Sequence, residues 1–312
     1  MNLAGRGVIL TTDARDLLTR LAGKMDAVFG PTPVARHEQD YALAVEYGYS
    51  LYLEKPPVLN PEAFCRMLQL EERAVRPTVV WFQALADPRR LALRERIVAG
   101  EFGRLLSVAF SGFWPREQAY HTSSRWVGCL KRDGELILDS VFGNAMAHFL
   151  NNLLFCCGTG DLWSWGEVKH PEAELYRAHP IESPDTAFVS GETRGGVDLR
   201  FCGSHACANI WKHQETLHAE HTSLVFPASG DVVILCPDGK RKVVPYVGGG
   251  AFEELSMLRF LLSLASPEQR GGMTIREALP FVDFHQPAQQ KKGLPASQKS
   301  PITAPSARPA EF

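Results

Sequence analysis

The 312-residue sequence predicts an α/β protein: an incomplete, doubly wound parallel sheet followed by an α+β domain with a largely antiparallel, open sheet. Strand-like and helix-like segments alternate with short connections up to Gly100. This rhythm is typical of parallel strands joined by crossover helices. After Gly103 the pattern changes to many strands and turns with few helices. We therefore predict domains at 1–103 and 104–285, and a disordered tail at 286–312 that is rich in polar residues.

Capping residues mark the helices of the first domain. Asp13, Asn60 and Asp87 are good N-cap residues, and a proline follows the last two at the first helical position. The expected elements are a helix from Asp13 to about Ala22, a strand at 26–30, a helix ended by Gly48, a strand at 49–53, a helix from Asn60 to about Ala74, a strand at 78–82 and a helix from Asp87 to Gly100.

The second domain is dominated by apolar, strand-like runs. We expect strands at 105–113, 162–168, 186–192, 197–202 and 232–235, and helices at about 141–157, 252–264 and 274–284.

Composition limits the classes of partner. The net charge is −2 and no long basic block is present, so nucleic acid and anionic membranes are poor candidates. No apolar run approaches the roughly 20 residues of a membrane-spanning helix, and the first residues lack a signal-peptide pattern. The seven cysteines form no CxxC pair. Together these features favour a reduced, cytoplasmic protein.

Two places in the sequence have residues suited to chemistry. Lys55 follows a buried strand, at the carboxyl end where ligands gather in parallel sheets. Asn144, His148 and Asn152 recur every four residues and form a polar stripe on one helix, with Asp139 near its start. A histidine there suits general acid–base catalysis, although a structural histidine at a domain interface is the alternative.

Other suggestive residues predict less. His213, His218, Glu220 and His221 lie in an extended region where their side chains would diverge, so no metal site is expected. Gly248, Gly249 and Gly250 lack the lysine of a phosphate-binding loop and suggest a flexible turn.

Two segments resemble the Gfo/Idh/MocA family of NAD(P)-dependent oxidoreductases. The first combines Asp26-Ala-Val-Phe-Gly-Pro-Thr-Pro, then His37, Gly48 and Glu54-Lys55-Pro56. The second is Gly100-Glu-Phe-Gly-Arg-Leu-Leu-Ser-Val108, which is followed by Arg125-Trp126-Val-Gly128 and the stretch 134–158. The resemblance covers roughly residues 8–285 and is strongest up to 160.

The resemblance implies a Rossmann-like first domain, hydride transfer between NAD or NADP and a sugar, inositol or related polyol, and a homo-oligomer formed through the sheet of the second domain. It implies that Lys55 handles a proton, with His148, Asp139 and Asn144 completing the catalytic set. Asn144 and His148 compete for the position of the family's histidine. Cofactor contacts are expected from Thr32, Pro33, His37, Glu54 and Lys55, and substrate contacts from Arg125 and Trp126. The Lys55–Pro56 bond is a candidate cis peptide bond.

The chain departs from the family at its start. Gly5-Arg6-Gly7 is too short for the Gly-x-Gly-x-x-Gly loop that holds the cofactor pyrophosphate, and no strand precedes it. The open interpretations are a misplaced start, a truncated gene, or a divergent relative that no longer needs the cofactor. Missing central strands would leave an apolar sheet edge that a partner chain could cover.

These departures leave rival functions open. One rival is a ligand-binding or regulatory relative without catalysis, which would keep sugar binding and lose dinucleotide affinity. Another is cofactor-assisted elimination or glycoside cleavage, in which the dinucleotide would be bound tightly and regenerated.

Overall fold

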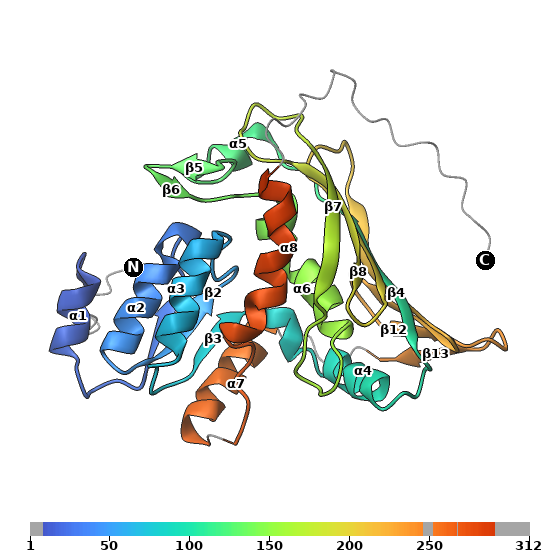
Figure 1. Cartoon of the computed structure of the whole chain (residues 1–312), viewed down its shortest axis with the longest axis horizontal. Helices are drawn as coiled ribbons and strands as arrows, with labels where there is room; N and C mark the ends of the chain where they lie inside the picture. The colour runs from blue at the N-terminus through green and yellow to red at the C-terminus, as the bar shows by residue number, and fades with distance from the viewer. Residues whose placement is uncertain (1–8, 246–251, 267, 291–312) are drawn as a thin grey trace.

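A computed structural model describes residues 9–245, 252–266 and 268–290 of the chain. A small parallel sheet and a large, mostly antiparallel sheet lie on either side of helix α8, Leu279–Gln290 (Figure 1). The predicted fold class is therefore confirmed. The Gly248–Gly250 segment lies outside the described residues, as do residues 291–312 of the predicted tail.

The small sheet has three strands in the order β1 (Ala27–Gly30), β2 (Ser50–Glu54) and β3 (Thr78–Trp81). Both pairs are parallel, as predicted, because a helix crosses over between successive strands. The helices of this region are α1 (Ala14–Arg20), α2 (His37–Glu46), α3 (Pro61–Glu71) and α4 (Pro88–Val98), with short 3₁₀ turns η2 (Val34–Arg36) and η3 (Gln83–Ala86).

The two faces of β2 pack against different helices because side chains alternate along a strand. Leu51 and Leu53 belong to the main core together with residues of α2 and α3. Tyr52 points the other way, stacks on Phe260 of α7 (Phe252–Ala265) at 5.0 Å between ring centroids, and donates a hydrogen bond to Ser256 Oγ. The small sheet is thus a layer between α2–α3 and α7.

β1 is an edge strand of the small sheet. In the part of the chain that the structure describes, only α1 precedes it, and no glycine-rich turn does. Phe29 is 41% exposed on this strand. Phe29 is the one exposed side chain of this edge strand, so the apolar edge expected from the sequence remains a prediction.

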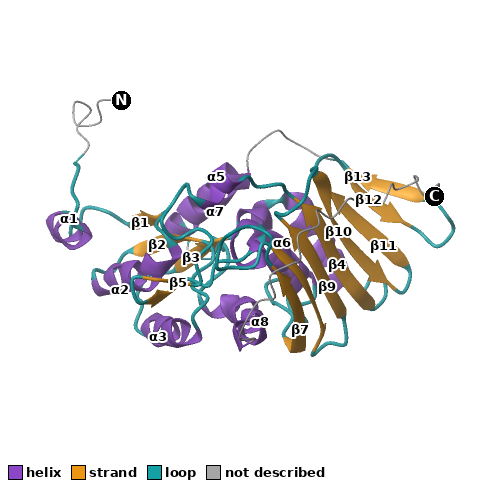
Figure 2. Cartoon of the chain, turned by 90° about the horizontal axis from the view of Figure 1, so that it is seen from above, coloured by secondary structure: helices purple, strands orange, loops and turns teal. Residues whose placement is uncertain are grey.

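The large sheet has eight strands in the order β13-β12-β11-β10-β4-β9-β8-β7. Every neighbouring pair is antiparallel except β4 and β9. Figure 2 shows these strands side by side, with α6 (Ala147–Cys156) and α8 on the side toward the small sheet. The strands are β4 (Leu105–Phe113), β7 (Val168–Tyr176), β8 (Thr186–Thr193), β9 (Asp198–Ser204), β10 (Trp211–Ala219), β11 (Thr222–Pro227), β12 (Val232–Leu235) and β13 (Arg241–Val244).

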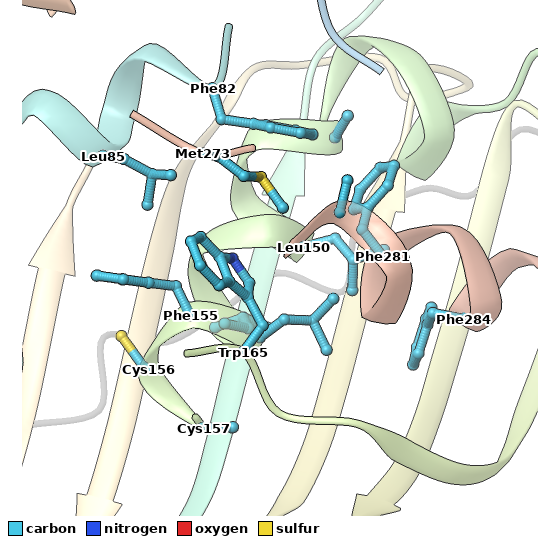
Figure 3. Close-up of a cluster of buried hydrophobic side chains, with 14 of the residues drawn as sticks. Phe82, Leu85, Leu150, Phe155, Cys156, Cys157, Trp165, Met273, Phe281 and Phe284 are labelled. Carbon is cyan, nitrogen blue, oxygen red and sulfur yellow. The ribbon is translucent and has the colours of Figure 1, made fainter. Parts of the chain in front are cut away.

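One continuous core joins the two sheets. Phe82, which follows β3, packs on Phe281 of α8 at 5.2 Å, and Val80 N donates to Met273 O at 2.8 Å. Figure 3 shows Phe82, Met273 and Phe281 beside Leu150 of α6, in front of the large sheet. Because these contacts cross between the two predicted domains, the apolar core fixes one against the other.

Several predicted elements differ from the structure. The run predicted as a strand at 162–168 is irregular up to residue 167, and β7 begins only at Val168. Arg94 of α4 donates to Gly158 O, Asp161 O and Ser164 Oγ, which holds this segment in turns and loops. The helix predicted at 141–157 is divided into a π-helical segment, η4 (Val141–Ala145), and α6. The predicted helix 274–284 begins as a 3₁₀ turn, η5 (Arg276–Ala278), and then continues as α8 to Gln290, past the predicted start of the tail at 286.

The remaining elements are small. A short helix, α5 (Gln118–His121), and a two-stranded hairpin, β5 (Lys131–Arg132) and β6 (Glu135–Leu136), connect β4 of the large sheet to η4. None of the helices in the described ranges is long and apolar enough to cross a membrane.

Candidate active site

Lys55 lies directly after β2 and reaches across to η4. Its Nζ donates to Asn144 O at 2.9 Å and to Asn144 Oδ1 at 3.3 Å, and its side chain is only 13% exposed. Burial lowers the pKa of Lys55, while the charges of Glu54 and Asp139 oppose that shift. A buried ammonium with a lowered pKa at the carboxyl end of a parallel strand is suited to moving protons.

A π-turn presents Asn144 to Lys55. Ser140 Oγ accepts from Gly143 N at 2.8 Å and starts the segment. At Gly143 a Cβ would lie 2.6 Å from Ser140 Oγ and 2.8 Å from Leu59 Cδ1, so no larger residue fits there without movement. Single π-turns within helices occur often at functional sites because they redirect side chains.

Asp139 holds the amide of Asn144 in place. Its Oδ1 accepts from Asn144 Nδ2 at 3.0 Å, and its Oδ2 accepts from Gly128 N at 2.7 Å. Burial raises the pKa of Asp139, and these two hydrogen bonds oppose the rise. A continuous hydrogen-bonded chain therefore runs from Gly128 through Asp139 and Asn144 to Lys55.

His148 lies one helical turn beyond Asn144 but does not line the same cavity. Its ring meets Phe82 edge-on at 5.7 Å, and it faces a second cavity. Burial, and then the positive charge of Lys55, lowers the pKa of His148 to about 3. The imidazole is therefore neutral near pH 7, and Asn144 rather than His148 is the direct partner of Lys55.

The cavity beside Lys55 has a volume of about 290 Å³. Of the predicted site residues, the structure brings together at its wall Thr32, Glu54, Lys55, Trp126, Asp139 and Asn144. Burial raises the pKa of Glu54, and its carboxylate lies 4.0 Å from Lys55 Nζ. The Lys55–Pro56 peptide bond is cis, as expected.

The remaining predicted site residues lie elsewhere. His37 is buried and ties the loop after β1 to the one after β2, with Nδ1 at 2.8 Å from Pro56 O and Nε2 at 2.8 Å from Thr32 O. Pro33 precedes η2 and does not line the cavity. The side chain of Arg125 is 77% exposed and pairs with Asp133, so it points away from the site.

One buried cluster was not predicted from the sequence. Arg90 donates to both carboxylate oxygens of Glu215, at 2.8 and 2.9 Å, and Asn152 Nδ2 donates to Glu215 Oε1 at 3.0 Å. The only member of the cluster that the sequence pointed to was Asn152, on the predicted polar stripe. The other two members, on α4 and β10, are distant from it in the sequence. Among the described residues, no group of histidine, cysteine or acidic side chains is arranged to hold a metal.

The cavity's residues fit one end of a dinucleotide. A buried lysine, a carboxylate and an indole around about 290 Å³ suit a nicotinamide ring and a hydroxyl beside it. The described residues offer no glycine-rich turn at a helix N-terminus for the pyrophosphate. The fit is therefore to the reacting end of the cofactor and not to its phosphates.

No family model matches the chain. Inositol 2-dehydrogenase of Corynebacterium glutamicum is 33% identical over 88 residues, which are 28% of this chain and 26% of that protein. The matched segment thus spans about a quarter of the curated relative's length.

Solved structures share the fold over most of the chain. WlbA dehydrogenase from Bordetella pertussis, in complex with NADH and UDP-GlcNAcA, has a TM-score of 0.71 at 20% identity and covers 95% of this chain and 86% of that one. Levoglucosan dehydrogenase, in complex with NADH and levoglucosan, has a TM-score of 0.71 at 16% identity, covering 89% and 82%.

An oxidoreductase from Agrobacterium radiobacter, in complex with NAD⁺, L-tartaric acid and magnesium, has a TM-score of 0.68 at 16% identity, covering 88% and 79%. The likeness extends through both sheets. The chain therefore shares the fold of solved NAD-binding oxidoreductases, as the resemblance predicted from its sequence implied.

Proposed function

We propose that this chain is an oxidoreductase that transfers hydride between NAD or NADP and a sugar, inositol or related polyol. One observation carries the proposal: the buried Nζ of Lys55 is held by Asn144 at the carboxyl end of β2, beside the carboxylate of Asp139. The similar structures bound to NADH and to sugar ligands support the same reaction class.

Lys55 handles the hydroxyl proton. In the oxidising direction the O–H bond of the substrate breaks, its proton passes to the neutral Nζ of Lys55, and a carbonyl forms as the carbon loses hydride. When bound, a nicotinamide cofactor supplies the hydride acceptor. Burial lowers the pKa of Lys55, which increases the neutral fraction of the amine.

Asn144 and Asp139 act as positioning residues. Asn144 fixes Nζ through two oxygens, and Asp139 fixes the amide of Asn144. Preorganised hydrogen bonds of this kind avoid reorganisation during reaction. Thr32, Glu54 and Trp126 line the space in which the nicotinamide and the substrate carbon would meet, and Pro33 and His37 shape the loop that carries Thr32.

The large sheet supports a proposal of homo-oligomerisation. Apolar side chains are exposed on it, including Phe188 at 45% and Val243 at 56%. Exposed apolar side chains on a sheet are typical of protein–protein contacts. A cytoplasmic location is part of the same proposal, since all seven cysteines are unpaired.

The proposal is tested by titrating the folded 312-residue chain with NADH and with NADPH while nicotinamide fluorescence is recorded. Saturable binding of either nucleotide, weakened at least tenfold in Lys55→Ala and unchanged in Arg125→Ala, is the expected result. A folded chain that binds polyols with no affinity for either nucleotide would instead be a ligand-binding relative.

A further inference from the structure

A second cavity lies against α6 and shares no wall residue with the cavity beside Lys55. Its volume is about 410 Å³, within the range of small-molecule sites. We call it the α6 chamber; its principal wall residues are His148, Phe149, Asn152, Trp114, His213 and Glu215.

Three polar atoms of residues that line the chamber are buried without a partner among the described residues. They are Asn152 Oδ1, His148 Nδ1 and Arg90 Nε. Asn152 is 1% exposed, and its Nδ2 already donates to Glu215. A buried, unpaired acceptor is unfavourable, so such an atom is usually matched by a ligand or water hydroxyl.

Part of the wall is aromatic. Phe149 lies 4.4 Å from the ring of His213 and 5.5 Å from the ring of Trp114, measured between centroids. Flat apolar surfaces combined with a few placed polar atoms suit a compact ring that has both C–H and O–H groups.

The cations at the chamber are already neutralised. Arg90 is bound through two nitrogens to Glu215, and both residues are buried. Arg89 binds both carboxylate oxygens of Asp87 as well as Gly230 O. An anionic ligand would either displace Glu215 from Arg90 and leave a buried carboxylate unpaired, or bind at Arg90 Nε beside that carboxylate, and both are unfavourable.

We propose that the α6 chamber binds the ring of an uncharged polyhydroxylated substrate, a cyclitol or an unphosphorylated neutral sugar, and excludes uronic acids and sugar phosphates. Asn152 Oδ1 and His148 Nδ1 receive substrate hydroxyls, and Trp114 and Phe149 contact the ring's C–H faces. This assignment rests on the proposed function, because a ring in the chamber is useful only if its carbon reaches Lys55 past His148.

The experiment measures equilibrium binding by calorimetry, using the full chain with and without NADH. The probes are myo-inositol, glucose, glucuronate and glucose 6-phosphate. Asn152→Ala removes the unpaired acceptor. Asn151→Ala is the matched control, because Asn151 lies next to it on α6, is equally buried, and binds Trp165 Nε1 instead of lining the chamber.

We expect glucose to bind at least tenfold more tightly than glucuronate or glucose 6-phosphate. Asn152→Ala should weaken binding of the neutral rings about fivefold to tenfold, and Asn151→Ala should leave it unchanged. Charged sugars that bind as tightly as glucose, neutral rings that do not bind, or equal effects of the two variants would overturn the proposal.

Two features keep the test decisive. The comparison of neutral with charged sugars needs no variant, so it holds even if both substitutions prevent folding. NADH affinity is measured separately on the same preparation: its loss counts against the proposed oxidoreductase, whereas intact NADH binding with no preference for neutral rings counts against the chamber alone.

Discussion

The Lys55 site and the α6 chamber differ in how their polar atoms are paired, although Asn144 at the first and His148 at the second are only one helical turn apart. Around Lys55 the chain Gly128–Asp139–Asn144–Lys55 is closed by hydrogen bonds. In the chamber, Asn152 Oδ1 and His148 Nδ1 are buried and unpaired within the described residues. The difference indicates that the groups that handle the proton are preorganised by hydrogen bonds, whereas the polar atoms of the chamber are available to bind a ligand.

Replacing Lys55 should produce the largest effect. Lys55→Met removes the proton-handling amine while retaining the length and apolar stem of the side chain, so kcat should fall by about 10²–10⁴-fold. Steady-state NAD(P)⁺ reduction with a neutral polyol measures it. An unchanged kcat in a folded variant would remove Lys55 from the mechanism.

Acidification should destabilise the folded chain through three buried histidines. Burial lowers the pKa values of His148, His205 and His285 to about 3, 4 and 4, from 6.5. The folded state therefore favours neutral rings. The resulting stability is full above pH 6.5 and is lost as the pH falls toward 4, by at most about 1.4 kcal/mol per pH unit per histidine.

Urea unfolding at pH 7.5 and at pH 5 measures this loss, and His148→Gln should reduce it. A free energy of unfolding that is equal at both pH values would show that these rings are not held neutral.

Gly143→Ala should disturb the Lys55 site through the π-turn. The added Cβ meets Ser140 Oγ and Leu59, so we expect a loss of about 1–3 kcal/mol in unfolding free energy. Gly134→Ala is a useful comparison: no atom lies within 4 Å of its Cβ position, although its φ of +89° adds backbone strain alone. If Gly143→Ala is no more destabilising than Gly134→Ala, the π-turn is not tightly packed.

Asn144→Asp should shift the pH profile of kcat. A carboxylate beside Nζ favours the charged ammonium and raises the pKa of Lys55, so the acid limb should move upward by about one pH unit. A merely structural Asn144 would lower stability without moving that limb.

Arg125→Ala should have the smallest effect. The side chain is 77% exposed, and the ion pair that it forms with Asp133 is also at the surface. Activity and sugar binding should stay within twofold of the original chain. A larger loss in sugar affinity would show that Arg125 contributes to substrate binding.

The order and pairing of the strands in the small sheet could be predicted from the sequence. The strands at β1, β2 and β3 follow apolar runs bounded by prolines and caps, and each pairs with its sequence neighbour through a short crossover. The position of Lys55 at the end of β2 follows directly from this pattern.

Long-range arrangement was less predictable. β4 pairs with β9 and β10, which are far along the chain, and the turns at 162–167 depend on Arg94 from α4. The π-turn that selects Asn144 over His148 as partner of Lys55 depends on packing at Gly143. The Arg90–Glu215–Asn152 cluster likewise needs three distant elements, and local patterns carry no information on such pairing.

The most direct test of the central claim is isotope transfer. The folded chain is incubated with NAD⁺ or NADP⁺ and with neutral cyclitols and sugars that carry deuterium on carbon. The mass of the reduced dinucleotide is then measured by mass spectrometry. Hydride transfer at the Lys55 site predicts a dinucleotide that carries one deuterium, and predicts its loss in Lys55→Met. Reduced dinucleotide without deuterium, or none from any neutral ring, would contradict the account.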